Sequence, residues 1–149
     1  KAAIHLDKSK DLLTRIQKSY HKNGLDMGSR SFIQGDIYKH LPKAIKNGQR
    51  FDGIILDPPP KVYKSPYSDH QPRGQDFSRL VSLCSKLLNP GGWLICLFHR
   101  YDATWDQSDA EIIESSSCTL KMTERFTSEC DFPDDNIDRK LRVTVFEKM

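Results

Sequence analysis

Apolar positions along the chain follow two spacings. Short apolar runs predict strands, and apolar residues that recur every three or four positions predict amphipathic helices. The runs place strands at 2–6, 31–34, 51–56, 93–98, 120–127 and 141–145. The longer spacing places helices at 9–20, 37–45, 77–88 and 105–117. Turn signals at Asn23-Gly24 and at 89–92 mark two helix ends.

The order of these elements indicates the fold class. Strands and helices alternate along most of the chain, and the last two strands follow one another. Parallel strands are joined by helical crossovers, whereas consecutive strands pair as hairpins. We therefore expect an α/β, Rossmann-like fold: a doubly wound, mostly parallel sheet with helices on both faces and a C-terminal antiparallel hairpin.

The strands differ in expected burial. Those at 51–56 and 93–98 lack polar alternation, which predicts burial on both faces and, for the first, a central place in the sheet. In the last strand Arg142 and Thr144 alternate with apolar residues, which predicts one face toward water. His5 lies within the first strand, where we expect a core histidine with a hydrogen-bond partner.

Composition narrows the class of protein. The 149 residues are 37% hydrophobic and 29% charged, which suits one globular domain spanning 1–149. The sequence has no apolar run as long as a membrane helix and no signal-peptide pattern, so we expect a cytoplasmic protein. The cysteines form no C-x-x-C pair, which favours structural thiols, and no metal-ligand spacing is present, so we expect no metal site.

Charge is unevenly distributed along the chain. Residues 1–75 hold 14 basic and 7 acidic residues, whereas residues 76–149 hold 9 and 13. A basic half suits a partner with phosphate groups, although scattered surface lysines serve solubility equally well. The charge therefore gives only weak support for a nucleic-acid partner.

Three aspartates stand where predicted strands end: Asp7, Asp36 and Asp57. The carboxyl ends of parallel strands meet at one edge of a sheet, where open α/β sheets bind their ligands. One such carboxylate can accept both hydroxyls of a ribose and the next the amino group of an adenine, so the pair suits a nucleoside-shaped ligand. The alternative is that Asp7 and Asp36 cap the helices that follow them.

The segment from Asp57 to about Arg73 is long and has no periodicity. Loops of this length in compact domains usually have a function. Its first residues, Pro58-Pro59-Pro60, fix an extended backbone and leave carbonyl groups without competing N–H partners. Rigid acceptors at a strand end suit a planar base.

Four segments together resemble a known family. They are IHLDKSKDLL (4–13), FIQGDIYKHL (32–41), RFDGIILDPPP (50–60) and LLNPGGWLICLF (87–98). Their succession resembles class I S-adenosylmethionine-dependent methyltransferases, in particular the large-subunit ribosomal RNA methyltransferase family. The resemblance covers about residues 1–100. It implies the fold given above, S-adenosylmethionine as the cofactor, and RNA, most specifically ribosomal RNA, as the partner.

The resemblance also implies roles for individual residues. The implied cofactor-binding residues are Asp7 for the ribose hydroxyls, Asp36 with the Ile37 backbone for the adenine, and Lys8 and Asp57 beside them. The implied catalytic residues, where methyl donor and target base meet, are Asp57, Pro58, Pro59 and His99. The implied substrate-binding residues are Pro60, Lys61, Lys64 and Arg73. The charges of Lys61, Lys64 and Arg73 would meet RNA phosphates, or they are only solvated.

The chain departs from the family in two ways. The family's first strand and glycine-rich loop would precede Lys1, so we expect a part of a larger domain whose sheet lacks a central strand here. Cytosine-modifying relatives carry a cysteine where this chain has His99, and Cys96 lies inside a strand, where burial would keep it a thiol. We therefore expect direct transfer to nitrogen or oxygen, with Asp57 or His99 as proton acceptor, although His99 also suits a structural role.

Three functions fit these features. The leading hypothesis is a methyltransferase that acts on a nucleic-acid base. The first alternative is a noncatalytic RNA-binding module that retains the fold without the glycine-rich loop. The second is a nicotinamide-dependent dehydrogenase, because a strand-end aspartate suits that ribose too. We rank it last, since Asp57-Pro58-Pro59 has no purpose in such an enzyme.

Overall fold

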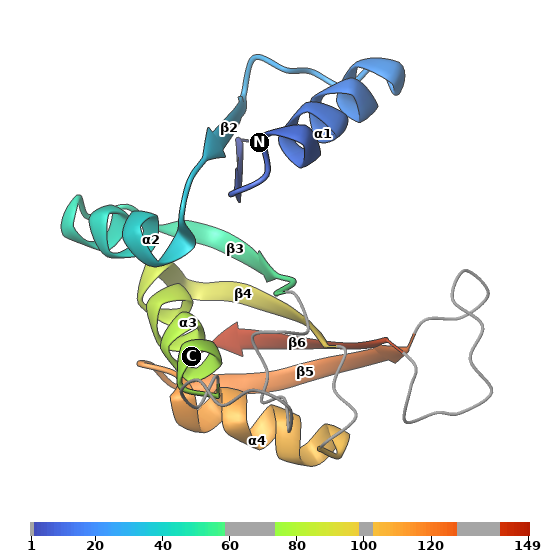
Figure 1. The fold of residues 1–149 in the computed structure, drawn as a ribbon. Helices are drawn as coiled ribbons and strands as arrows, with labels where there is room; N and C mark the ends of the chain where they lie inside the picture. Colours follow the sequence, from blue (N-terminus) through green and yellow to red (C-terminus); the bar gives the residue numbers. More distant parts are fainter. Residues whose placement is uncertain (1, 59–73, 99–102, 128–140) are drawn as a thin grey trace, which may run out of the picture. The chain divides into compact units, whose positions relative to one another are not determined.

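The structure, a computed structural model, describes residues 2–58, 74–98, 103–127 and 141–149 (Figure 1). The elements are β1 (Ala3–Asp7), α1 (Lys10–Lys22), β2 (Arg30–Gln34), α2 (Ile37–Lys46), β3 (Phe51–Leu56), α3 (Gly74–Leu87), β4 (Leu88–Phe98), α4 (Trp105–Ser115), β5 (Leu120–Thr127) and β6 (Arg142–Lys148). This order confirms the one predicted from the sequence. The pairs β1–β2 and β3–β4 are parallel and β5–β6 is antiparallel, which confirms the C-terminal hairpin.

The chain forms two compact units, which we call the N-terminal unit (Lys1–Asn47) and the C-terminal unit (Gly48–Met149). Strand pairing follows the same division. In the N-terminal unit β1 pairs with β2, and in the C-terminal unit the strand order is β3-β4-β6-β5. That all 149 residues form one catalytic domain stays a prediction.

An aromatic cluster joins α1 to the strands of the N-terminal unit. His5 of β1 lies opposite Phe32 of β2, and the two rings stack with their centroids 5.0 Å apart. His5 Nε2 and the Tyr20 hydroxyl of α1 are hydrogen-bonded at 3.1 Å, which confirms the predicted partner, although His5 is half-buried rather than in the core. Burial and, to a lesser extent, the Arg30 guanidinium disfavour the imidazolium and lower the pKa of His5.

The core of the C-terminal unit lies where α3 packs on the four-stranded sheet. Phe77 and Val81 of α3, Leu94 of β4 and Phe146 of β6 are all fully buried. The apolar residues of α3 recur at helical spacing, so one face of the helix is covered and the opposite face is polar. Burial of this apolar surface is the main source of stability in this unit.

Burial of β3 and β4 differs from the prediction. β3 lies at the edge of its sheet rather than at the centre, and its Ile55 is 65% exposed. In β4, Leu94 and Cys96 are fully buried, but Trp93 on the opposite face is 41% exposed. The prediction of burial on both faces is therefore wrong for the described residues. An apolar run shows that both faces are apolar, but it does not show which face a helix of this unit covers.

The polar residues of β6 are buried, although we predicted a face toward water. Arg142 is 4% exposed and Thr144 is fully buried. Thr144 Oγ1 accepts a hydrogen bond from the Trp105 indole N–H at 2.8 Å, and the Arg142 guanidinium donates to the Ala103 carbonyl at 2.8 Å. Polar side chains are buried where such partners exist, and alternation along a strand does not reveal the partners.

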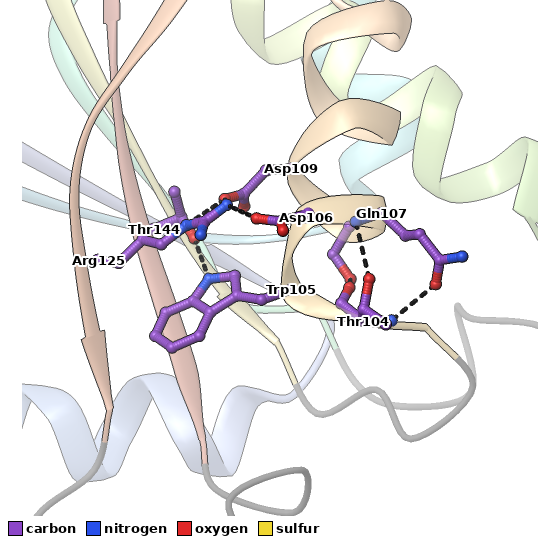
Figure 2. Close-up of polar contacts among 8 residues, drawn as sticks. Thr104, Trp105, Asp106, Gln107, Asp109, Arg125 and Thr144 are labelled. Carbon is purple, nitrogen blue, oxygen red and sulfur yellow. Dashed lines mark hydrogen bonds and ion pairs between the residues drawn. The ribbon is translucent and has the colours of Figure 1, made fainter.

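A charged cluster joins α4 to β5, as Figure 2 shows. The Arg125 guanidinium donates to Asp109 at 2.7 Å and to Asp106 at 2.6 Å, and it lies 5.4 Å from the Trp105 ring centroid. Asp109 is 4% exposed, and its Oδ1 has no hydrogen-bond partner among the described residues. Thr104 begins α4 with a capping box. Arg125 therefore compensates a buried carboxylate.

The predicted turn at 89–92 lies within β4 as an irregular segment. The register between β3 and β4 shifts between Phe51 and Gly53, opposite these residues. Gly91 has a φ of 70°, a left-handed conformation that glycine adopts without strain. The turn prediction is therefore correct for the backbone, although the strand extends through it.

The helices of the described residues are short. The longest, α3, has 14 residues, and within these ranges no helix is long and apolar enough to span a membrane.

Candidate functional site

The candidate site lies at the carboxyl ends of β1 and β2 in the N-terminal unit. The two strands run in parallel, with Asp7 opposite Gln34. Beyond the last pair, the Gly35 N–H donates to the Asp7 carbonyl at 2.9 Å, and the Gln34 side-chain amide donates to the Lys8 carbonyl at 3.3 Å. These bonds hold the residues after both strands close together, as the sequence predicted for Asp7 and Asp36.

Asp7 shapes the turn that leads into α1. Its Oδ1 accepts a hydrogen bond from the Ser9 N–H at 2.6 Å. The N-cap of α1 is Ser9, whose hydroxyl accepts from the Leu12 N–H, so the alternative that Asp7 caps this helix is wrong. Asp7 is half-buried, and its Oδ2 has no hydrogen-bond partner in the part of the chain that the structure describes. One carboxylate oxygen is thus available to a ligand.

Asp36 is the N-cap of α2, which confirms the capping alternative for this residue. Its Oδ1 accepts from the Tyr38 N–H at 2.9 Å, and its Oδ2 forms an ion pair with Lys8 Nζ at 2.9 Å. The Lys8 ammonium first, and then the Tyr38 N–H, stabilise the carboxylate and lower the pKa of Asp36 below its ordinary value. Asp36 is therefore ionised at neutral pH. Capping does not exclude a second role, because a carboxylate oxygen can accept more than one hydrogen bond.

The Ile37 N–H is the first donor of α2. A helix leaves its first N–H groups without partners inside the helix. Within the described ranges, no acceptor bonds this N–H. The edge therefore presents a free carboxylate oxygen on Asp7, an ionised carboxylate on Asp36 and a free N–H on Ile37. This donor and acceptor set fits the adenosine part of a cofactor, with its vicinal hydroxyls, exocyclic amine and ring nitrogen.

Gly35 is a site residue that the sequence reasoning did not single out. A Cβ atom at this position would lie 2.2 Å from His40 Nε2, so the His40 ring is packed against the glycine backbone. Any other residue at 35 would displace His40 or shift the turn that carries Asp36. The available signal was a glycine directly between a predicted strand and its strand-end aspartate.

Asp57 and Pro58 lie in the C-terminal unit, at the carboxyl end of β3. Asp57 is exposed and Pro58 is buried, and Leu56 before them lies opposite Cys96 of β4. The structure thus groups Asp7, Lys8, Asp36 and Ile37 in one unit and Asp57 with Pro58 in the other. The remaining predicted residues lie outside the described residues: Pro59, Pro60, Lys61, Lys64, Arg73 and His99.

The buried cysteines of the C-terminal unit are thiols. Cys84 and Cys96 are free and buried. Burial raises the pKa of Cys84 to about 12 and raises that of Cys96 well above its ordinary value. A thiol in this environment is a poor nucleophile, which confirms the expected inert Cys96. Within the described ranges, no three His, Cys, Asp or Glu side chains gather as metal ligands.

Comparison with known proteins shows which protein family the chain matches. The family model of S-adenosylmethionine-dependent methyltransferases matches residues 1–147. The ribosomal RNA large subunit methyltransferase I of Cronobacter sakazakii is 34% identical over 92 residues, which are 62% of this chain and 23% of that protein. The enzyme of the same name from Klebsiella pneumoniae is 33% identical over 90 residues, 60% of this chain and 22% of that protein. The chain thus spans less than a quarter of the length of these relatives.

Solved structures share the fold. A Streptococcus mutans protein described as a SAM-dependent methyltransferase superposes with a TM-score of 0.81 at 19% identity, covering 98% of this chain and 38% of that one. The N-methyltransferase NodS of Bradyrhizobium japonicum superposes with a TM-score of 0.68 at 14% identity, covering 99% of this chain and 73% of that one. At such identities the likeness shows the fold alone, and it confirms the predicted Rossmann-like α/β class.

Proposed function

The chain belongs to the S-adenosylmethionine-dependent methyltransferase family, and we propose that it transfers a methyl group from S-adenosylmethionine to a base in ribosomal RNA. The family's methyl donor is the cofactor that the sequence predicted. The RNA substrate is supported by relatives that are named ribosomal RNA large subunit methyltransferase I. The excess of basic residues in 1–75 suits such a polyanion. A ribosomal substrate also agrees with the cytoplasmic location expected from the sequence.

The observation that carries the proposal is the donor and acceptor set at the ends of β1 and β2. We assign Asp7 Oδ2 to the ribose hydroxyls, because it is the free oxygen of a carboxylate whose other oxygen is held by the Ser9 N–H. We assign Asp36 and the Ile37 N–H to the adenine, because together they offer an acceptor for its amine and a donor for its ring nitrogen. Lys8 directly follows Asp7 in the sequence and forms an ion pair with Asp36.

The bound cofactor supplies an electrophilic methyl group on a sulfonium. The chain's own part in the reaction is to orient the target base and to take up the proton that a nitrogen or oxygen nucleophile releases. We assign these tasks to the end of β3, where Asp57 is an exposed carboxylate and Pro58 is buried and rigid. Pro59 and His99 complete the proposed catalytic set, and Pro60, Lys61, Lys64 and Arg73 the proposed RNA contacts.

A binding experiment tests the cofactor site. In the full-length protein, Asp7→Ala and Asp36→Ala should each weaken S-adenosylhomocysteine binding by roughly 10- to 100-fold, the range of hydrogen bonds to charged groups. Isothermal titration calorimetry gives the affinities. Asp26→Ala is the matched control, because Asp26 is an exposed aspartate of the same unit that also holds a turn, through the Gly28 N–H. Unchanged affinity in both site variants would overturn the proposed site.

The reaction itself is tested with the unmodified protein. Labelled S-adenosylmethionine and ribosomal RNA should give labelled RNA, and Asp57→Asn should reduce the rate of transfer more than it reduces cofactor affinity. RNA binding that falls with salt, without cofactor binding or transfer, would instead favour the noncatalytic RNA-binding module.

A further inference from the structure

Lys8 is an exposed residue of the candidate site whose side chain pairs with the Asp36 carboxylate. Its ammonium lies 2.9 Å from Asp36 Oδ2, while 70% of the Lys8 side chain is exposed, against 31% for Asp36. Lys8 directly follows Asp7 and precedes the helix-capping Ser9, so its backbone is fixed by the turn. Its four-carbon side chain is free to rotate away from the carboxylate.

The two oxygens of Asp36 are therefore held in different ways. Oδ1 accepts from the Tyr38 N–H at the start of α2, a backbone group that cannot leave without breaking the cap. Oδ2 is paired with Lys8, a flexible side chain that water can replace. A ligand amine that approaches Asp36 meets an oxygen that is already occupied by an ammonium of this chain.

We propose that Lys8 is an internal competitor for the adenine amine at Asp36 and thereby sets the affinity for the cofactor. In the ligand-free protein the Lys8 ammonium takes the place of the amine on Oδ2, and binding of the adenosine part releases Lys8 to solvent. This inference rests on the proposed function, because it takes the assignment of Asp36 to the adenine as its starting point.

The competition lowers affinity without preventing binding. Exposed ion pairs contribute little to stability because water and salt screen them, so displacing Lys8 costs about two- to fivefold in affinity. Arginine at position 8 would compete more strongly, since its planar fork can hold a carboxylate by two parallel hydrogen bonds. The expected order of affinity is therefore Lys8→Met, then the unmodified protein, then Lys8→Arg.

The test is calorimetric titration of the full-length protein with S-adenosylhomocysteine, whose ammonium and carboxylate cancel in net charge. At low salt Lys8→Met should bind about two- to fivefold more tightly than the unmodified protein. Rising salt screens the ion pair, so the unmodified protein should approach the affinity of Lys8→Met. Lys10→Met is the control, because Lys10 is an exposed lysine two residues away in the first turn of α1. It should not change the affinity.

A second readout needs no cofactor. The carboxyl signal of Asp36, followed by NMR as a function of pH, should show its pKa rise toward the ordinary value in Lys8→Met and stay low in Lys8→Arg. An unchanged pKa in Lys8→Met would mean that the ion pair is absent in solution and would overturn the proposal.

The outcomes separate this inference from the proposed function. Weaker or unchanged binding by Lys8→Met at low salt, with binding weakened as expected in Asp7→Ala and Asp36→Ala, overturns the competition and leaves the proposed cofactor site intact. Unchanged binding in both aspartate variants overturns the site and the competition together.

Discussion

The two units of this chain show two ways in which a fold supports function. In the N-terminal unit the candidate site is held by local hydrogen bonds, such as those of Asp7 and Asp36 to nearby N–H groups. Leu13 is the apolar residue of this unit that is most deeply buried, at 5% exposed. In the C-terminal unit Phe77, Leu94 and others are fully buried. In the N-terminal unit, turn geometry therefore positions the groups proposed to bind a ligand, whereas the C-terminal unit is held together mainly by the packing of buried side chains.

The largest expected effect tests this difference in packing. Phe146→Ala should lower the free energy of unfolding of the C-terminal unit by about 3–5 kcal/mol, because Phe146 is fully buried and its removal leaves a cavity. Phe32→Ala in the N-terminal unit should cost about half as much, since Phe32 is only half-buried. Native-state hydrogen exchange measures each unit separately. Equal losses in the two units would contradict the comparison.

An intermediate effect is expected at the polar cluster of the C-terminal unit. Arg125→Met should lower the free energy of unfolding by about 2 kcal/mol, because it leaves the buried Asp109 carboxylate without its cation. This loss is smaller than that for a fully buried pair, since the Arg125 side chain is 31% exposed. Urea unfolding measures the loss. Asp106→Asn is the control. It should lower the free energy of unfolding by less than about 0.5 kcal/mol, because the Asp106 side chain is 85% exposed. Similar losses in both variants would show that burial of Asp109 is not the cause.

The smallest effect is a pH dependence of the N-terminal unit. The pKa of His5 is lowered in the folded state, so the unfolded chain takes up a proton at a higher pH than the folded one. The contribution of His5 to stability is therefore complete above about pH 6.5 and is lost as the pH falls below that value. His5→Gln should reduce the loss of stability between pH 7.5 and about pH 5.5. His21→Gln, at an exposed position of α1 in the same unit, should retain this loss of stability. Hydrogen exchange at both pH values distinguishes the two variants.

Much of the fold was predictable because its signals are local. The order of strands and helices follows from apolar spacing, and Ser9 is recognisable as a cap because a small polar residue precedes a helical stripe. The pairing of Asp7 and Asp36 at one edge follows from the rule that parallel strands end together. Burial was less predictable, as Trp93 and Arg142 show, because it depends on what another element places against each face.

The candidate site, like the fold, was predictable from the sequence only in part. Strand-end positions predicted Asp7 and Asp36 as ligands, and the family resemblance added the Ile37 backbone. The structure adds that Asp7 Oδ1 and Asp36 Oδ1 accept hydrogen bonds from backbone N–H groups and that Asp36 is ionised, and the ligand role itself stays a proposal. The ion pair of Lys8 with Asp36 could not be read from the sequence, since it joins the ends of two strands that are 28 residues apart in the sequence. The contact between His40 and Gly35 likewise depends on the angle at which α2 leaves β2.

The sequence by itself determined the succession of elements and the family, because these depend on residue type and spacing along the chain. Only the tertiary structure decided which oxygen of Asp7 is free, which cation neutralises Asp36 and why Arg142 and Thr144 are buried. The first depends on the geometry of one turn, and the others depend on atoms brought together from distant parts of the chain. A hydrogen bond or ion pair requires separations of about 3 Å, and spacing along the sequence does not specify such distances.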